Sequence, residues 1–249
     1  MYKALYNINE QNLIKIRSHL GHNTGKLNNK INPYLYGTRH NINIYDIKKL
    51  WTSYRYLFYN FSEMFLKRNT FFIVGTNKRI PVNLLLKNWL AQDPFINKKN
   101  NKFYVSGYVD KKWIGGLFSN WKIFYEFIKY IPMFNKGIKI KYKFEKYMSN
   151  LQGAVNLQKM PIPDFIIMLD KDKIALDEIK NLQVPLIGII DTDMDPDDFI
   201  YKFLGNNDSI EYLDFVFSFI SEAIKEGRLK EQQLFYIYVI SKIKRKLNG

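Results

Sequence analysis

The sequence predicts an α/β protein with an open, parallel β-sheet sandwiched by helices. Two unbroken apolar runs, 165–169 and 186–190, flank a short amphipathic segment with helical spacing. Strand, helix and strand at this spacing form a βαβ unit with parallel strands. Strands that are apolar on both faces belong in a parallel sheet that helices cover on both sides. A fold of this kind does not assign a function, so the rest of the chain must do so.

The other elements follow from the pattern of apolar residues along the chain. Helical periodicity predicts helices at 13–20, 47–67, 82–90, 121–131, 139–157, 210–226 and 229–247. Shorter apolar runs predict strands at 71–76, 103–105 and 201–204. The helices on either side of Pro132 form a predicted helical hairpin that projects from the α/β pattern. Gly227 is expected to end one helix before the last, basic helix begins.

These elements divide the chain into an α/β domain with two appendages. Residues 1–120 hold an N-terminal basic loop and the first part of the α/β domain, and 161–227 hold its second part. The helical hairpin, 121–160, is an insertion between the two parts. Residues 228–249 are a basic C-terminal helical extension.

The charge of the chain is unevenly distributed. The chain has 38 basic and 23 acidic residues and a net charge of +15. Residues 163–226 hold 5 of the basic and 15 of the acidic side chains, which leaves 33 and 8 for the rest. A basic surface of this size is typical of polyanion binding, and the acidic part is expected to face away from the polyanion. The alternative is solvated charge that has no partner.

Several classes of protein are disfavoured by what the sequence lacks. With no cysteine, the chain has neither disulfides nor thiolate metal sites. It has no apolar run of the ~20 residues that a membrane span needs. No signal peptide or amphipathic presequence is visible at residues 1–10. The P-loop and the dinucleotide-binding glycine pattern are both absent.

A long segment rich in Gly, Asn and Lys, 21–47, is the first candidate for binding RNA. We expect it to be largely irregular, because it shows no strong period. Lys26, Lys30 and Arg39 supply positive charge there, and Tyr36 offers an aromatic ring. Basic loops with aromatic residues suit RNA, which presents phosphates and unstacked bases. The alternative is an exposed loop in a lysine-rich protein.

Two further basic positions follow predicted strands. Lys78 and Arg79 lie where a phosphate could sit on the next helix N-terminus. Lys111, Lys112 and Trp113 precede a pair of glycines. We interpret all five as RNA contacts, in which phosphate pairing positions the protein and aromatic stacking contributes to recognition.

A cluster of aspartates after the second strand of the βαβ unit is the one candidate for catalysis. An EF-hand beginning at Asp191 would need glycine and glutamate where Pro196 and Lys202 stand. A metal-dependent phosphoryl hydrolase using Asp191 and Asp193 is the competing hypothesis. The alternative is that these carboxylates are loop residues or caps. We predict no catalytic residue, no metal ligand and no cofactor.

Six segments, taken in order, resemble the family of small-subunit ribosomal protein two, the universal S-two family. SHLGHNTGKLNNKINPYLYGTRHNINIYDI (18–47) resembles its N-terminal signature, and FFIVGTNK resembles its first sheet strand. FYVSGYVDKKWIGGLFSNW (103–121) resembles its tryptophan–glycine–glycine motif. PDFIIMLD, VPLIGIIDTDMDPD and FLGNNDSI resemble its C-terminal signatures. The resemblance ends near Gly227.

The resemblance implies a flavodoxin-like fold with a protruding helical hairpin, and a structural, non-enzymatic role in translation. It implies contact with small-subunit rRNA between the head and body of the subunit. The implied neighbours are small-subunit ribosomal proteins of families three, five and eight and, in bacteria, the first protein. It implies no membrane and no homo-oligomer. A free RNA-binding regulator is a third hypothesis.

Composition also predicts where the chain is encoded. Lysine outnumbers arginine 31 to 7, and asparagine and isoleucine are plentiful, as in an AT-rich genome. Together with the missing presequence, this predicts a mitochondrial, organelle-encoded copy. A plastid or an AT-rich bacterium is the alternative.

Overall fold

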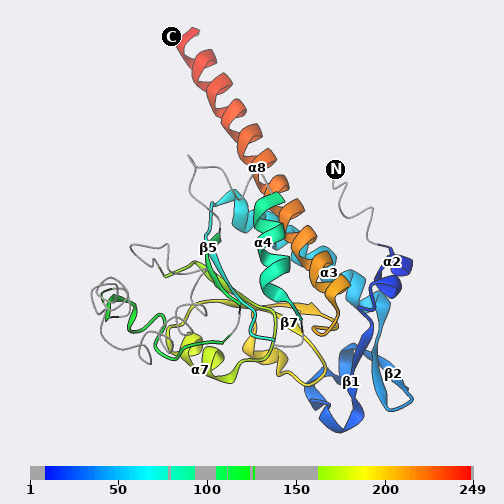
Figure 1. Ribbon diagram of the computed structural model, residues 1–249. Helices are drawn as coiled ribbons and strands as arrows, with labels where there is room; N and C mark the ends of the chain where they lie inside the picture. Colours follow the sequence, from blue (N-terminus) through cyan, green and yellow to red (C-terminus); the bar gives the residue numbers. More distant parts are fainter. Residues whose placement is uncertain are drawn as a thin grey trace.

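The computed structural model describes residues 9–77, 80–92, 105–110, 112–123, 126 and 162–247 (Figure 1). At the centre of this part of the chain is a parallel five-stranded sheet in the order β5-β4-β6-β7-β8. The strands are β4 (Phe71–Val74), β5 (Val105–Val109), β6 (Phe165–Met168), β7 (Leu186–Ile190) and β8 (Tyr201–Leu204). Numbered along the chain, this is the 2-1-3-4-5 order of flavodoxin-like sheets. The predicted fold class is confirmed.

Helices cover both faces of the sheet, as its fully buried strands require. On one face lie α3 (Ile47–Leu66), α4 (Val82–Gln92) and α8 (Ile210–Leu247), and α7 (Lys173–Asn181) lies across the sheet from them (Figure 1). Aromatic rings fill both layers. Phe61 of α3 packs against Phe165 and Phe203 at centroid distances of 6.1 and 5.5 Å. On the other face, Phe72 packs against Phe118 at 5.1 Å.

The βαβ unit predicted from the sequence is present as β6, α7 and β7. The two strands pair in parallel, with Ile166 opposite Leu186. Asp172 begins α7 as its N-cap, because its carboxylate accepts hydrogen bonds from the backbone N–H groups of Ile174 and Ala175. This unit forms the centre of the core.

The N-terminal region differs from the prediction. A short helix, α2 (Glu10–Lys15), replaces the helix expected at 13–20. The segment expected to be irregular forms an antiparallel sheet of β1 (Leu20–Asn23), β3 (Ile42–Tyr45) and β2 (Leu35–Arg39), with 3₁₀ turns at 24–26 and 29–34. In β3 the apolar alternation does not mark the buried face, because Asn43 and Tyr45 are buried while Ile42 and Ile44 are only half-buried. We call β1, β2, β3 and these two turns the N-terminal sheet.

The expected helix end at Gly227 is also wrong, because α8 runs without a break from Ile210 to Leu247. A Cβ on Gly227 would lie 2.8 Å from the carbonyl oxygen of Ser62 and 2.9 Å from the backbone nitrogen of Leu66. Glycine is therefore used here so that α8 can approach the backbone of α3 closely.

Two other predicted elements have different outcomes. The strand expected at 103–105 is found as β5, which lies further along the chain. The helical hairpin expected at 121–160 falls almost entirely outside the described residues, which include only 121–123 and 126 of it.

Candidate nucleic-acid interface

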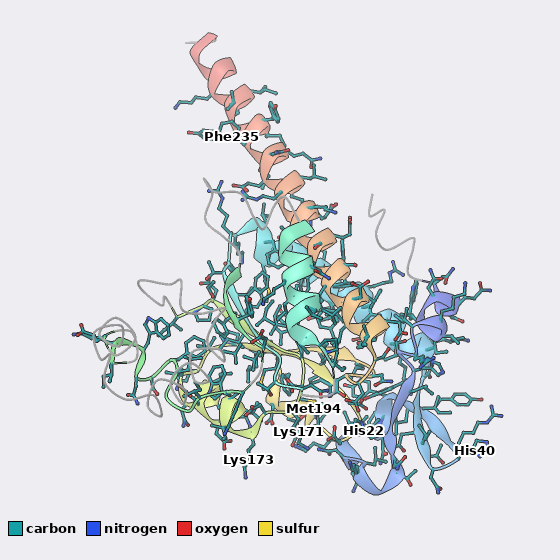
Figure 2. All side chains as sticks on the ribbon, in the orientation of Figure 1. His22, His40, Lys171, Lys173, Met194 and Phe235 are labelled. Atoms are coloured by element: carbon teal, nitrogen blue, oxygen red, sulfur yellow. The ribbon has the colours of Figure 1, made fainter. Side chains whose placement is uncertain are left out.

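The N-terminal sheet ends in an exposed hairpin tip between β2 and β3. His40 and Asn41 form the turn with left-handed backbone angles, φ 48° and 61°. His40 lies at the outer end of this hairpin (Figure 2). Arg39, which directly precedes the turn, is exposed, and the Tyr36 side chain is 83% exposed. A cationic group and an aromatic ring are thus both open to solvent on one short strand.

Lys26 is brought to the same end of the N-terminal sheet. It lies in the 3₁₀ turn that follows β1, and the backbone N–H of Thr24 in that turn donates to the carbonyl oxygen of Asn41 at 2.9 Å. Lys26 is exposed. The structure therefore joins the turns that carry Lys26 and Arg39, which are distant in sequence. We call Lys26 and Arg39 the tip residues; the exposed Tyr36 lies further back on β2.

Lys30 faces a different environment from the tip residues. Its Nζ lies 2.8 Å from a carboxylate oxygen of Asp195 and 2.6 Å from one of Asp197. The hydrogen bond to Asp195, followed by the one to Asp197, raises the pKa of Lys30. An RNA phosphate at Lys30 would have to compete with both carboxylates. The predicted contact is untested, but Lys30 already links the N-terminal sheet to the acidic loop 191–198.

His22 forms a second link between the N-terminal sheet and the core. Its Nδ1 lies 3.1 Å from Oδ2 of the fully buried Asp191, and its backbone N–H donates to Oγ1 of Thr192 at 2.8 Å. Nε2 lies 3.6 Å from Oδ2 of Asp208. The hydrogen bond to Asp191 raises the pKa of His22, although burial lowers it in part. No local pattern in the sequence predicts this role, because both partners lie more than 160 residues further along the chain.

Trp113 is not available for stacking on an RNA base in this structure. Its side chain is 1% exposed, and its indole Nε1–H donates to Glu178 at 2.9 Å. The backbone N–H groups of Gly116, Phe118 and Ser119 donate to the same carboxylate at 2.8 to 3.2 Å. Burial raises the pKa of Glu178, but these hydrogen bonds outweigh it and lower the pKa. The tryptophan–glycine–glycine segment therefore binds the carboxylate of Glu178 on α7 through the indole N–H and three backbone N–H groups.

The other predicted RNA contacts are only partly placed. Lys112 is exposed, next to the buried Trp113. It belongs to the segment bound to α7, which lies well apart from β1 and β2 (Figure 1). Lys78, Arg79 and Lys111 lie outside the described residues.

The loop aspartates hold the structure together. Asp191 accepts from the backbone N–H of Thr192 and Asn207, and Asp195 caps the 3₁₀ turn at Pro196–Asp198. Asp198 pairs with Lys180 at 2.6 Å. Among the described residues, no three His, Cys, Asp or Glu side chains are grouped so that they could hold a metal ion. Of the two carboxylates proposed for a hydrolase, Asp191 is held by these hydrogen bonds and by His22, and Asp193 lies 3.7 Å from Nζ of Lys171.

A second buried carboxylate lies after β6. Asp170 is 7% exposed and accepts from the backbone N–H and the hydroxyl of Thr76 at 2.9 and 3.0 Å. Burial raises its pKa to about 6, against the effect of the Thr76 hydrogen bonds. It joins the ends of β4 and β6 and is part of the scaffold beside the N-terminal sheet.

Together, these observations define a class of α/β protein. The polar side chains of its loops stabilise the fold, and its exposed basic and aromatic residues are of the type that contacts nucleic-acid backbones. None of the helices in the described part of the chain has both the length and the apolar character needed to cross a membrane.

Comparison with known proteins identifies the family. A family described as "Ribosomal protein S2" matches residues 13–227, and the chain belongs to this family of structural, non-enzymatic ribosomal proteins. Its relatives include proteins named "Small ribosomal subunit protein uS2". The one from Acinetobacter baylyi is 27% identical over 239 residues, which cover 90% of this chain and 91% of the relative. The one from Helicobacter pylori (strain P12) is 29% identical over 234 residues, 88% and 83% of the two chains. The hydrolase hypothesis is therefore wrong.

Proposed function

We propose that this protein is a structural constituent of the small ribosomal subunit and that it binds small-subunit rRNA through its N-terminal sheet. The observation that carries the proposal is the exposure of Lys26 and Arg39 at the hairpin end of that sheet and of Tyr36 further back on the same strand, β2. Lysine and arginine can neutralise phosphates there, and the tyrosine ring can stack on an unpaired base.

The tip is better suited to RNA than Lys30 is. Next to Lys30, the carboxylates of Asp195 and Asp197 would repel a phosphate. The acidic loop is therefore the side of the N-terminal sheet that faces away from the RNA in this proposal. Lys78, Arg79, Lys111 and Lys112 are secondary candidates.

The test compares two charge reversals of equal size. Lys26→Glu with Arg39→Glu changes the tip, and Lys67→Glu with Lys87→Glu changes two exposed lysines, the C-cap residue of α3 and a residue of α4. Sedimentation of assembled subunits over a salt series measures retention. The tip variant should be released at lower salt and should lose roughly one unit of salt slope per phosphate contact. Equal retention of both variants would remove the tip from the interface.

We further propose that the particle is mitochondrial and that its neighbours include small-subunit proteins of families three, five and eight and, if the particle is of bacterial type, the first protein. The excess of lysine over arginine supports an AT-rich organellar genome, although the relatives named above are bacterial. Locating the gene on organellar or nuclear DNA tests the first part. Cross-linking within purified subunits tests the second.

A further inference from the structure

The last part of α8 projects beyond the body of the protein and exposes large apolar side chains. Phe235 lies on this projecting part (Figure 2). The side chains of Phe235, Tyr236 and Ile237 are 64%, 67% and 63% exposed. Leu234, Tyr238 and Ile240 are exposed to similar extents, 52% to 60%. We call residues 232–247 the distal segment.

The distal segment begins where the polar contacts of α8 with α3 end. Lys230 pairs with Glu63 at 2.9 Å, and the Nε–H of Arg68, just after α3, donates to Glu231 at 2.7 Å. Before this point α8 is a core helix, with Phe217 only 1% exposed. The match to the Ribosomal protein S2 family also stops at residue 227. The distal segment thus lies outside the part of the chain that matches the family.

The distal segment contains a stretch, 234–240, that is apolar around the whole circumference of the helix. Residues 234–240 are seven consecutive apolar side chains, LFYIYVI. At about 3.6 residues per turn they cover every side of the helix. A helix that is hydrophobic all round is one that is buried on all sides. A flat docking surface would leave half of these side chains in water, so the occupant must enclose the helix.

A protein socket fits these observations better than a bilayer or RNA. The apolar run is about 10 Å long, against the ~30 Å of a bilayer core. RNA has no apolar surface on which Leu234 and Ile237 could be buried, and 232–241 carries no charge. After Glu231 the chain has no acidic residue. Its charged residues there are Lys242, Lys244, Arg245 and Lys246.

We propose that the distal segment inserts into an apolar socket on another protein, and that acidic side chains on the rim of the socket pair with the basic C-terminal residues. Apolar burial would supply the affinity, and charge complementarity would set the direction of insertion. The proposal depends on the proposed function in one respect only, which is that the partner is sought in the small-subunit particle.

A photoreactive cross-linker tests the proposal. Benzoylphenylalanine replaces Phe235 in the full-length chain, and in a control chain it replaces Ile200, which is 61% exposed on the body. After irradiation of purified particles, mass spectrometry identifies the cross-linked peptides. The probe at position 235 should mark one protein, at an apolar site with neighbouring Asp or Glu residues, and the control probe should not. Adding Ile237→Glu should lower the cross-link yield about tenfold or more, whereas Lys67→Glu should leave it unchanged.

The other outcomes separate this proposal from the proposed function. Cross-links to rRNA, to lipid, to a second copy or to this chain's own residues would overturn the socket, as would an unchanged yield with Ile237→Glu. Unchanged thermal unfolding of Ile237→Glu will show that the variant is folded. If the chain does not sediment with particles, the proposed function fails. In that case the complex that contains the chain is purified from cells, and cross-linking from position 235 within it tests the socket by itself.

Discussion

The forces that stabilise the parallel-sheet core differ from those that attach the N-terminal sheet to it. In the core, Phe61, Phe203 and Phe219 are buried and pack edge to face at centroid distances of 5.2 to 6.4 Å. The N-terminal sheet is attached to this core by apolar side chains and also by polar groups: His22 to Asp191, and Lys30 to Asp195 and Asp197. Apolar burial responds little to pH or salt, whereas ion pairs respond to both.

We therefore expect the polar part of this attachment to respond to pH and salt, and the packing of the core to respond little. The attachment of the N-terminal sheet also includes a buried hydrogen bond. The Tyr45 hydroxyl donates to the carbonyl oxygen of Ile190 at 3.0 Å. The apolar Ile31 is fully buried as well. The following variants measure how far the two regions differ.

The largest effect is expected from a cavity in the core. Phe61→Ala removes a ring that contacts α8 and two strands, and should lower the free energy of unfolding by about 3–5 kcal/mol. Chemical denaturation measures the change. Tyr36→Ala is the control, because it removes an exposed ring and should change stability by less than about 0.5 kcal/mol. Similar losses for both variants would contradict the assignment of Phe61 to the core.

The next largest effect is expected at a half-buried polar junction outside the N-terminal sheet, the carboxylate of Glu178. Glu178→Gln replaces one acceptor oxygen by an NH₂ group, which then faces either the donors of Trp113 and Gly116 or those of Phe118 and Ser119. Leaving such donors unsatisfied costs about 1–3 kcal/mol. The melting temperature and the near-ultraviolet signal of Trp113 should both change. The exposed Asp177→Asn provides a matched control on the same helix. An unchanged melting temperature for Glu178→Gln would show that the carboxylate is dispensable.

A smaller effect, and one that depends on pH, is expected at His22. Because its folded-state pKa is raised, its stabilisation is fully present below the ordinary pKa of about 6.5 and is lost as the pH rises through the higher folded value. His22→Gln should therefore destabilise the protein more at about pH 5.5 than at about pH 8.5. Melting curves of the wild-type and His22→Gln proteins at the two pH values give the difference in stability. The titrations of His19 and Asp170 occur in both proteins and therefore cancel in this difference. A constant or reversed difference would contradict the link to Asp191.

The smallest effect is expected at Lys30, because its ion pairs are exposed to solvent. Lys30→Ala should lower the melting temperature slightly at low salt and have no effect near 1 M salt, where charges are screened over about 3 Å. Lys15→Ala removes an exposed lysine from α2 and is the control. A loss that persisted at high salt would mean that Lys30 acts by packing.

The sequence by itself determined the elements whose pattern is local. The apolar runs became β6 and β7, and the helical spacing at 47–67 became α3, because a buried strand or amphipathic helix records its environment in consecutive residues. The exposure of Tyr36 and Arg39 also agrees with the composition of their segment.

Only the tertiary structure decided which polar groups meet. Lys30 pairs with Asp195, which lies 165 residues further along the chain, and Trp113 donates to Glu178 across 65 residues. No local pattern records such a contact, because a lysine or tryptophan has the same sequence signature whether it faces solvent or a distant carboxylate. Gly227 is the same case: its local signal predicts a helix end, but the close approach of α3 makes it a packing site within one continuous helix.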